Sequence, residues 1–150
     1  MTGVRTHLVS LVPPALLAVI LGFHPAYLLA MVAGVLLPTV DALDERLHRS
    51  WLFHTFLVPA ILYELLVQSG VDSALPAAVV ALHFLTIGML FHFVFDFVYP
   101  KEMSHEGTEW PVQPTIWSAP WGLFWLGLAW LFQWFVYLAP AFLPWLVTSL

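Results

Sequence analysis

Residues 75–99 read LPAAVVALHFLTIGMLFHFVFDFVY, an almost unbroken apolar stretch. A helix that crosses the hydrocarbon core of a bilayer needs about 20 such residues. Only His83, His92 and Asp96 in this stretch carry side chains that ionise near or below neutral pH. The stretch therefore predicts one membrane-spanning helix and an all-α fold.

The rest of the chain has the same apolar character. Of its 150 residues, 61% are hydrophobic and 9% are charged, whereas soluble domains are about 45–50% apolar and about 25% charged. The length fits one domain, so we expect residues 1–150 to form a single membrane-embedded helical domain. The net charge of −5 argues against nucleic acid as a partner, and the absence of cysteine excludes disulfides and thiolate metal ligands.

Two shorter apolar runs precede this stretch, over residues 8–21 and 26–37, with Gly-Phe-His-Pro between them at 22–25. Each run is short for a bilayer, and a proline suits the first turn of a new helix. The pattern predicts a hairpin of two short helices that enters the membrane and returns. One broken helix is the alternative.

Two apolar segments remain. Ser50 is positioned to cap a helix over residues 51–68, and residues 119–150 predict a last helix that spans to about residue 137. Pro140 and Pro144 are expected to bend or break it. The chain is thus predicted to be an integral membrane helical bundle of four to five short hydrophobic segments.

With the hairpin, the polar loops at residues 39–50 and 101–118 fall on the side of the N-terminus. All of the basic residues then lie on that side as well: Arg5, Arg46, Arg49 and Lys101. The positive-inside rule makes this side cytoplasmic. We therefore predict a multi-pass protein of the cell (inner) membrane.

His92 and Asp96 lie four residues apart, so they share one face of the predicted helix. They could ligate one metal ion, or they could form a His–Asp hydrogen bond that joins two helices, and the spacing does not decide between the two. His83 lies nine residues before His92 and is expected on the opposite face. There it could pair with Glu64.

Further His and Asp residues map to the cytoplasmic end of the bundle. Each has an ordinary explanation alone, such as a helix cap or a solvated loop. Together they predict a site for a divalent metal, zinc first, with manganese or iron as alternatives, and such a site supports hydrolysis. The residues concerned are His7, Asp41, Asp44, His48, His54, His92, Asp96 and His105.

Residues 7–100 resemble the YdjM/YbcI-like family of inner-membrane proteins, described as metal-dependent hydrolases. The best match is Gly88-x3-His92-x3-Asp96-x3-Pro100. Three weaker elements accompany it: His7, then Leu37-Pro38-Thr39-Val40-Asp41, then His48-Arg49-Ser50 followed by Phe53-His54-Thr55. Thr39 stands where the family has a further Asp, and Ser50 and Thr55 replace its Gly and Ser.

The resemblance and the positions together give a set of expected roles. The expected metal ligands are His54, His92 and Asp96, with Asp41 and His48 completing the shell and His7 behind them. Asp44 is expected to be a ligand or a general base, and Arg49 to hold an anionic group of the substrate. The expected reaction is hydrolysis of an ester or phosphoester, in a membrane lipid if the site lies at headgroup depth. A non-catalytic protein with a degenerate or structural His/Asp cluster, and a small transporter, are the alternatives.

Overall fold

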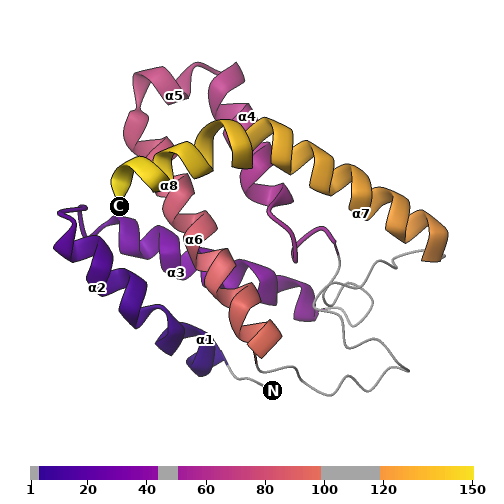
Figure 1. Cartoon of the computed structure of the whole chain (residues 1–150), viewed down its shortest axis with the longest axis horizontal. Coiled ribbons are helices and arrows are strands. Elements are labelled where there is room, and N and C mark those ends of the chain that lie inside the picture. Colours follow the sequence, from indigo (N-terminus) through magenta and orange to yellow (C-terminus); the bar gives the residue numbers. More distant parts are fainter. Residues whose placement is uncertain (1–3, 44–50, 99–118) are drawn as a thin grey trace.

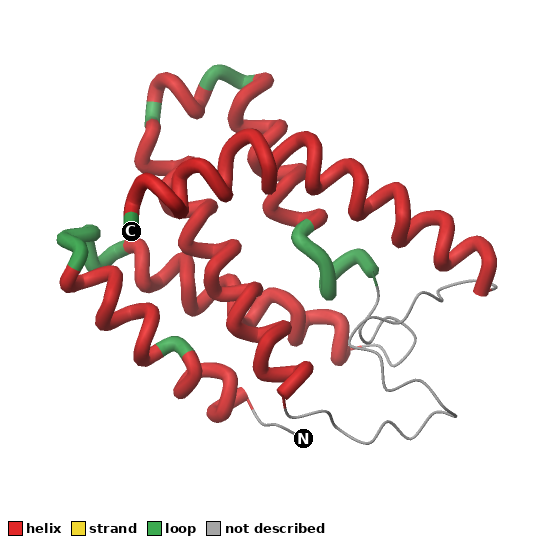
Figure 2. Tube along the Cα trace, in the orientation of Figure 1, coloured by secondary structure: helices red, strands yellow, loops and turns green. Residues whose placement is uncertain are grey.

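The structure is a computed structural model that describes residues 4–43, 51–98 and 119–150. These ranges contain helices and short connections and no strand, which confirms the all-α prediction (Figures 1 and 2). The elements are α1 Val4–Ser10, α2 Val12–Ile20, α3 Tyr27–Leu36, the 3₁₀-helix η1 Leu37–Leu43, α4 Leu57–Gln68, α5 Val71–Ala74, α6 Pro76–Val98, α7 Ala119–Gln133, the π-helix η2 Trp134–Phe142 and α8 Leu143–Ser149.

The central element is α6, which closely follows the stretch predicted from the sequence. It packs against α1, α3, α4 and α5. Two helical segments of the described ranges, Pro76–Asp96 and Phe124–Ser149, are long and apolar enough to cross a membrane. The other apolar helices are shorter, so a bundle of four to five spanning segments stays a prediction.

The exposed surface of the helices carries many large apolar side chains. Ile20, Leu29 and Val147 are 80%, 74% and 76% exposed, and only 28% of the apolar window within Phe124–Ser149 is buried. The core helix of a soluble protein would be mostly buried. Exposed large apolar side chains in this number are compatible with contact with lipid or with another protein.

The two predicted N-terminal helices and the turn between them are confirmed, whereas their entry into a membrane stays a prediction. The chain reverses after α2 at Gly22, whose φ of 83° favours glycine, and α3 then runs back to contact α1 and α6 (Figure 1). A break between α1 and α2 at Leu11 was not predicted. Pro13 and Pro14 explain it, because a proline has no N–H to donate and fits only the first turn of a helix.

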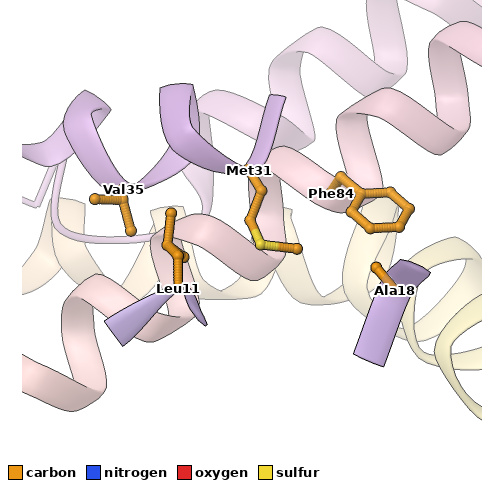
Figure 3. Close-up of a cluster of buried hydrophobic side chains, with 5 residues drawn as sticks. All are labelled: Leu11, Ala18, Met31, Val35 and Phe84. Atoms are coloured by element: carbon orange, nitrogen blue, oxygen red, sulfur yellow. The ribbon is translucent and has the colours of Figure 1, made fainter. Parts of the chain in front are cut away.

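The closest helix packing in the described part joins α3 to α6. A Cβ atom added to Gly88 would overlap the carbonyl group of Met31, and one added to Gly34 would overlap that of Leu85. Small residues let two helix backbones approach in this way. The adjacent core contains Leu11, Ala18, Met31, Val35 and Phe84 (Figure 3).

One predicted boundary is wrong. The helix expected from residue 51 begins at Leu57, because the ring of Pro59 would clash with the carbonyl group of residue 55 if the helix started earlier. The last helix bends near the prolines, one of the two predicted outcomes, and it does not break. The chain passes through Pro140 as a π-helix and continues into α8, whose axis turns away from that of α7 (Figure 1). Pro144 lies in the first turn of α8.

Candidate metal centre

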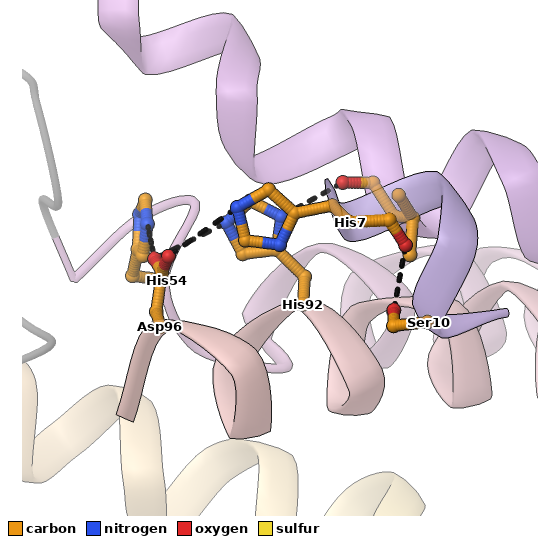
Figure 4. Close-up of polar contacts among 6 residues, drawn as sticks. His7, Ser10, His54, His92 and Asp96 are labelled. Atoms are coloured by element: carbon orange, nitrogen blue, oxygen red, sulfur yellow. Dashed lines mark hydrogen bonds and ion pairs between the residues drawn. The ribbon is translucent and has the colours of Figure 1, made fainter. Parts of the chain in front are cut away.

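Four polar side chains meet in the interior at one end of α6 (Figure 4). His92 and Asp96 come from α6, His7 comes from α1, and His54 comes from the connection that precedes α4. All four are at most 7% exposed. A buried carboxylate needs a partner of opposite charge or strong hydrogen bonds, so this arrangement has to be accounted for chemically.

The three imidazole rings converge on the one carboxylate. The Nε2 atom of His92 lies 3.3 Å from Oδ2 of Asp96, that of His7 lies 3.4 Å from Oδ1, and that of His54 lies 3.7 Å from Oδ2. These distances exceed the 2.7–2.9 Å or so of a charge-assisted N–H···O bond. Direct hydrogen bonds from three rings therefore do not describe the cluster well.

The orientation of His92 is set by the backbone of α3. Nδ1 of His92 lies 2.9 Å from the carbonyl oxygen of Val35. A carbonyl oxygen can only accept, so Nδ1 carries the proton and donates it. In a neutral ring, Nε2 then presents its lone pair to the Asp96 carboxylate. Two facing lone pairs repel, so a proton, on Nε2 or on the carboxyl group, or a metal ion is required between them.

The neighbouring ring of His7 makes it unfavourable for both histidines to be protonated. The rings of His7 and His92 are stacked, with centroids 4.2 Å apart and planes 12° apart. Two protonated imidazoles stacked in a buried site would repel strongly, because little water is present to screen them. One divalent ion would satisfy both rings and the carboxylate at once.

The geometry fits such an ion. His7, His92 and Asp96 each offer a ligand atom, and these atoms all lie within 4.8 Å of one another, so the group could hold a metal. Two atoms that each lie about 2.1 Å from a tetrahedral ion are about 3.4 Å apart. The 3.3 Å from His92 to Oδ2 and the 3.4 Å from His7 to Oδ1 are each close to this value, but they end on different oxygens of Asp96. The 3.7 Å from His54 to Oδ2 is slightly longer.

The structure thus brings together four of the residues named from the sequence, and it places His7 beside the carboxylate rather than behind it. Asp41 lies in η1, and its side chain is outside the described part. Asp44, His48, Arg49 and His105 also lie outside the described residues. The role of Val35 was not predicted, because it uses a backbone carbonyl, which every residue has.

His54 was expected in the first turn of a helix, and this is wrong. It lies in a bend that Thr55 stabilises. The Thr55 hydroxyl donates to the carbonyl oxygen of Trp51 at 2.8 Å and accepts from the N–H of Leu57 at 3.3 Å. A short hydrogen-bonded turn, rather than helix geometry, therefore directs His54 to Asp96.

The predicted pair of Glu64 and His83 is also wrong. Glu64 accepts a hydrogen bond from the Gln68 amide at 2.8 Å. Nδ1 of His83 lies 2.9 Å from the hydroxyl of Tyr137, which lies 2.7 Å from that of Thr86. His83 does point away from His92, as its spacing predicted, but its partner comes from η2. Tyr137, a hydroxyl-bearing residue in an otherwise apolar segment, was the only local signal for this partner.

No family model, no curated protein and no solved structure matches the chain. The resemblance of residues 7–100 to the YdjM/YbcI-like family therefore stays a prediction.

Proposed function

We propose that this chain is a multi-pass protein of the inner membrane that uses a divalent metal ion, zinc first, to hydrolyse an ester or phosphoester on the cytoplasmic side. The observation that carries the proposal is the hydrogen bond that Nδ1 of His92 donates to the carbonyl oxygen of Val35. It leaves Nε2 facing the Asp96 carboxylate, where a proton or a metal ion is needed.

The donor set favours a metal of hydrolytic enzymes. Imidazole nitrogens and a carboxylate suit zinc, iron and manganese, and the chain has no thiolate that would favour copper(I). An ion held by three protein ligands and an open position polarises an ester and makes a water easier to deprotonate. His7, His92 and Asp96 could supply three such ligands.

The side chains of the site would have different roles. Asp96 and His92 hold fixed positions one turn apart on α6, and the Val35 carbonyl keeps the His92 ring in one tautomer. The surrounding helices exclude water from the buried side. In the proposal, Asp44 acts as the general base and Arg49 holds the anionic substrate group, both as predicted from the sequence.

A non-catalytic account is favoured by one observation, the His7–Asp96 contact, which links α1 to α6. A protonated His7 would join these helices without a metal. The test is elemental analysis of protein purified in detergent without chelator, followed by assay of phosphate or fatty acid release from lipid vesicles. The proposal requires stoichiometric metal and metal-dependent release. Bound metal without release of phosphate or fatty acid would refute the hydrolase. Absence of metal would favour the non-catalytic account, in which the His–Asp contact only joins two helices.

The proposed orientation has a separate test. The chain has no cysteine, so single cysteines at Glu45 and Glu109, which lie outside the described residues, would be the only labelling sites. An impermeant thiol reagent should reach both from the cytoplasmic side of membrane vesicles. Labelling of the two positions from opposite sides would contradict the shared face.

A further inference from the structure

An apolar cavity of about 360 Å³ lies between α2, α6 and α8. This volume falls in the range of about 300–1,000 Å³ that is typical of ligand sites. The only side-chain hydroxyl among its lining residues belongs to Ser149. Three of the lining residues, Ala18, Met31 and Phe84, are drawn in Figure 3. A lining in which one hydroxyl and the indole of Trp145 are the only polar side-chain groups favours a hydrocarbon over a polar ligand.

One end of the cavity lies next to the helix turn that carries His92. The cavity is lined along one wall by Phe84 and by Phe91, and His92 follows Phe91 directly. The rise of a helix is about 1.5 Å per residue, so this wall extends about 10 Å along α6 away from the turn that carries His92. Helix α2 forms a second wall, from Pro13 to Leu21, and it begins just after α1, which carries His7. The cavity is therefore elongated and has one end near the cluster.

The outer side of α2 is apolar as well. Leu16 and Ile20 are 60% and 80% exposed, and Leu17, which lines the cavity, is 46% exposed. An apolar chain could thus pass from a lipid-facing surface into the cavity without crossing a polar barrier. A soluble polar ligand would find no favourable contact along the same path.

We propose that this cavity binds one acyl chain of a membrane lipid, whose polar end then lies at the cluster of His7, His54, His92 and Asp96. The inference rests on the proposed hydrolase function and gives it a substrate class, an acyl lipid whose ester or phosphoester bond is held next to the metal. The length of the wall along α6 and the shared turn at Phe91 and His92 set the head-to-tail direction.

The test uses the full chain in detergent and a phosphatidylglycerol that carries a photoactivatable diazirine near the end of one acyl chain. After illumination, mass spectrometry of peptides locates the adducts. In the wild type we expect saturable adducts on Phe84, Ile87 or Trp145, which excess unlabelled phosphatidylglycerol removes. Adducts restricted to the outer face of α2, and not removed by competitor, would overturn the proposal.

A matched pair of variants on α2 sharpens the test. Ala18 is buried and lines the cavity, whereas Ile20 points outward. Ala18→Phe should lower the saturable adduct about tenfold or more, since losing the burial of two methylene groups already weakens binding by about that factor. Ile20→Phe should leave it unchanged. Equal labelling of the two folded variants would contradict the proposal, and if Ala18→Phe does not fold, the wild-type adduct map decides.

Metal content separates this inference from the function on which it rests. Both variants should keep the wild-type metal, because neither position contacts the cluster. Saturable labelling of Phe84, Ile87 or Trp145 in a protein that binds no metal would support the acyl site and refute the hydrolase. Stoichiometric metal without saturable labelling would refute the acyl site alone.

Discussion

Helix α6 carries two buried polar clusters on opposite faces, and they are built differently. On one face, His83 meets Tyr137 and Thr86. The Thr86 hydroxyl lies 2.9 Å from the carbonyl oxygen of Leu82, to which it donates. The Tyr137 hydroxyl can then donate to Thr86 and accept from Nδ1–H of His83. Neutral groups alone satisfy these three contacts.

On the other face, Nδ1 of His92 donates to the carbonyl oxygen of Val35, and Nε2 faces the Asp96 carboxylate. A buried histidine is therefore not by itself a sign of a metal site. A metal ion is indicated where several imidazole rings converge on one carboxylate at distances longer than those of hydrogen bonds, as they do at Asp96.

The largest expected effect is at Asp96. Asp96→Asn keeps the shape and removes the charge on which three imidazole rings converge. We expect loss of all stoichiometric metal and a loss of stability of about 3 kcal/mol or more, since a buried ionic cluster would lack one partner. Elemental analysis measures the metal content, and thermal unfolding in detergent measures the stability. Asp72→Asn, at the opposite end of the bundle, is the control and should change neither quantity. If Asp96→Asn bound as much metal as the wild type, the ion would have to lie elsewhere.

The next effect is expected at Gly88, one turn before His92. Gly88→Ala would place a methyl group against the Met31 carbonyl and force α3 away from α6. Overpacking costs about 1–3 kcal/mol, and loss of the His92–Val35 hydrogen bond should weaken metal affinity about 10–100-fold.

The control for Gly88 is Gly127→Ala in α7, where an added Cβ meets nothing within 4 Å. This change should stabilise the protein by about 0.5–1 kcal/mol, because alanine favours helix over glycine. Metal titration and thermal unfolding of both variants give the comparison. Equal behaviour of the two glycines would mean that close packing of α3 and α6 does not position His92.

A smaller effect is expected at His54, which lies farthest from the carboxylate and on a non-helical segment. His54→Ala should lower metal affinity about tenfold and leave the helical content unchanged. His24→Ala, in the exposed turn before α3, should change neither the metal affinity nor the helical content. Complete loss of metal in His54→Ala would instead make His54 a principal ligand on a par with His7.

The smallest effect on the metal is expected in the neutral cluster. Tyr137→Phe removes the hydroxyl between His83 and Thr86 and should cost about 1–2 kcal/mol, with no change in metal content. Thermal unfolding and elemental analysis check both statements. If Tyr137→Phe released the metal, the two faces of α6 would be coupled, and the His83 cluster could not be regarded as independent of the Asp96 cluster.

The local features of α6 could be predicted from the sequence. Its apolar length predicted a spanning helix, the spacing of His92 and Asp96 placed them on one face, and the spacing of His83 placed it on the other. These predictions depend only on the period of the α-helix, which any helical segment obeys. The N-terminal hairpin likewise followed from the turn at Gly22, because a break between two apolar runs is a local signal.

Tertiary structure alone decided which side chains meet. That His7 joins Asp96, that His92 donates to Val35, and that His83 pairs with Tyr137 all depend on how helices far apart in the chain pack together. The start of α4, by contrast, follows from a local feature, the ring of Pro59. The physical reason for the difference is that helical periodicity gives the direction of a side chain from its own axis, whereas its partner depends on the relative position of two axes.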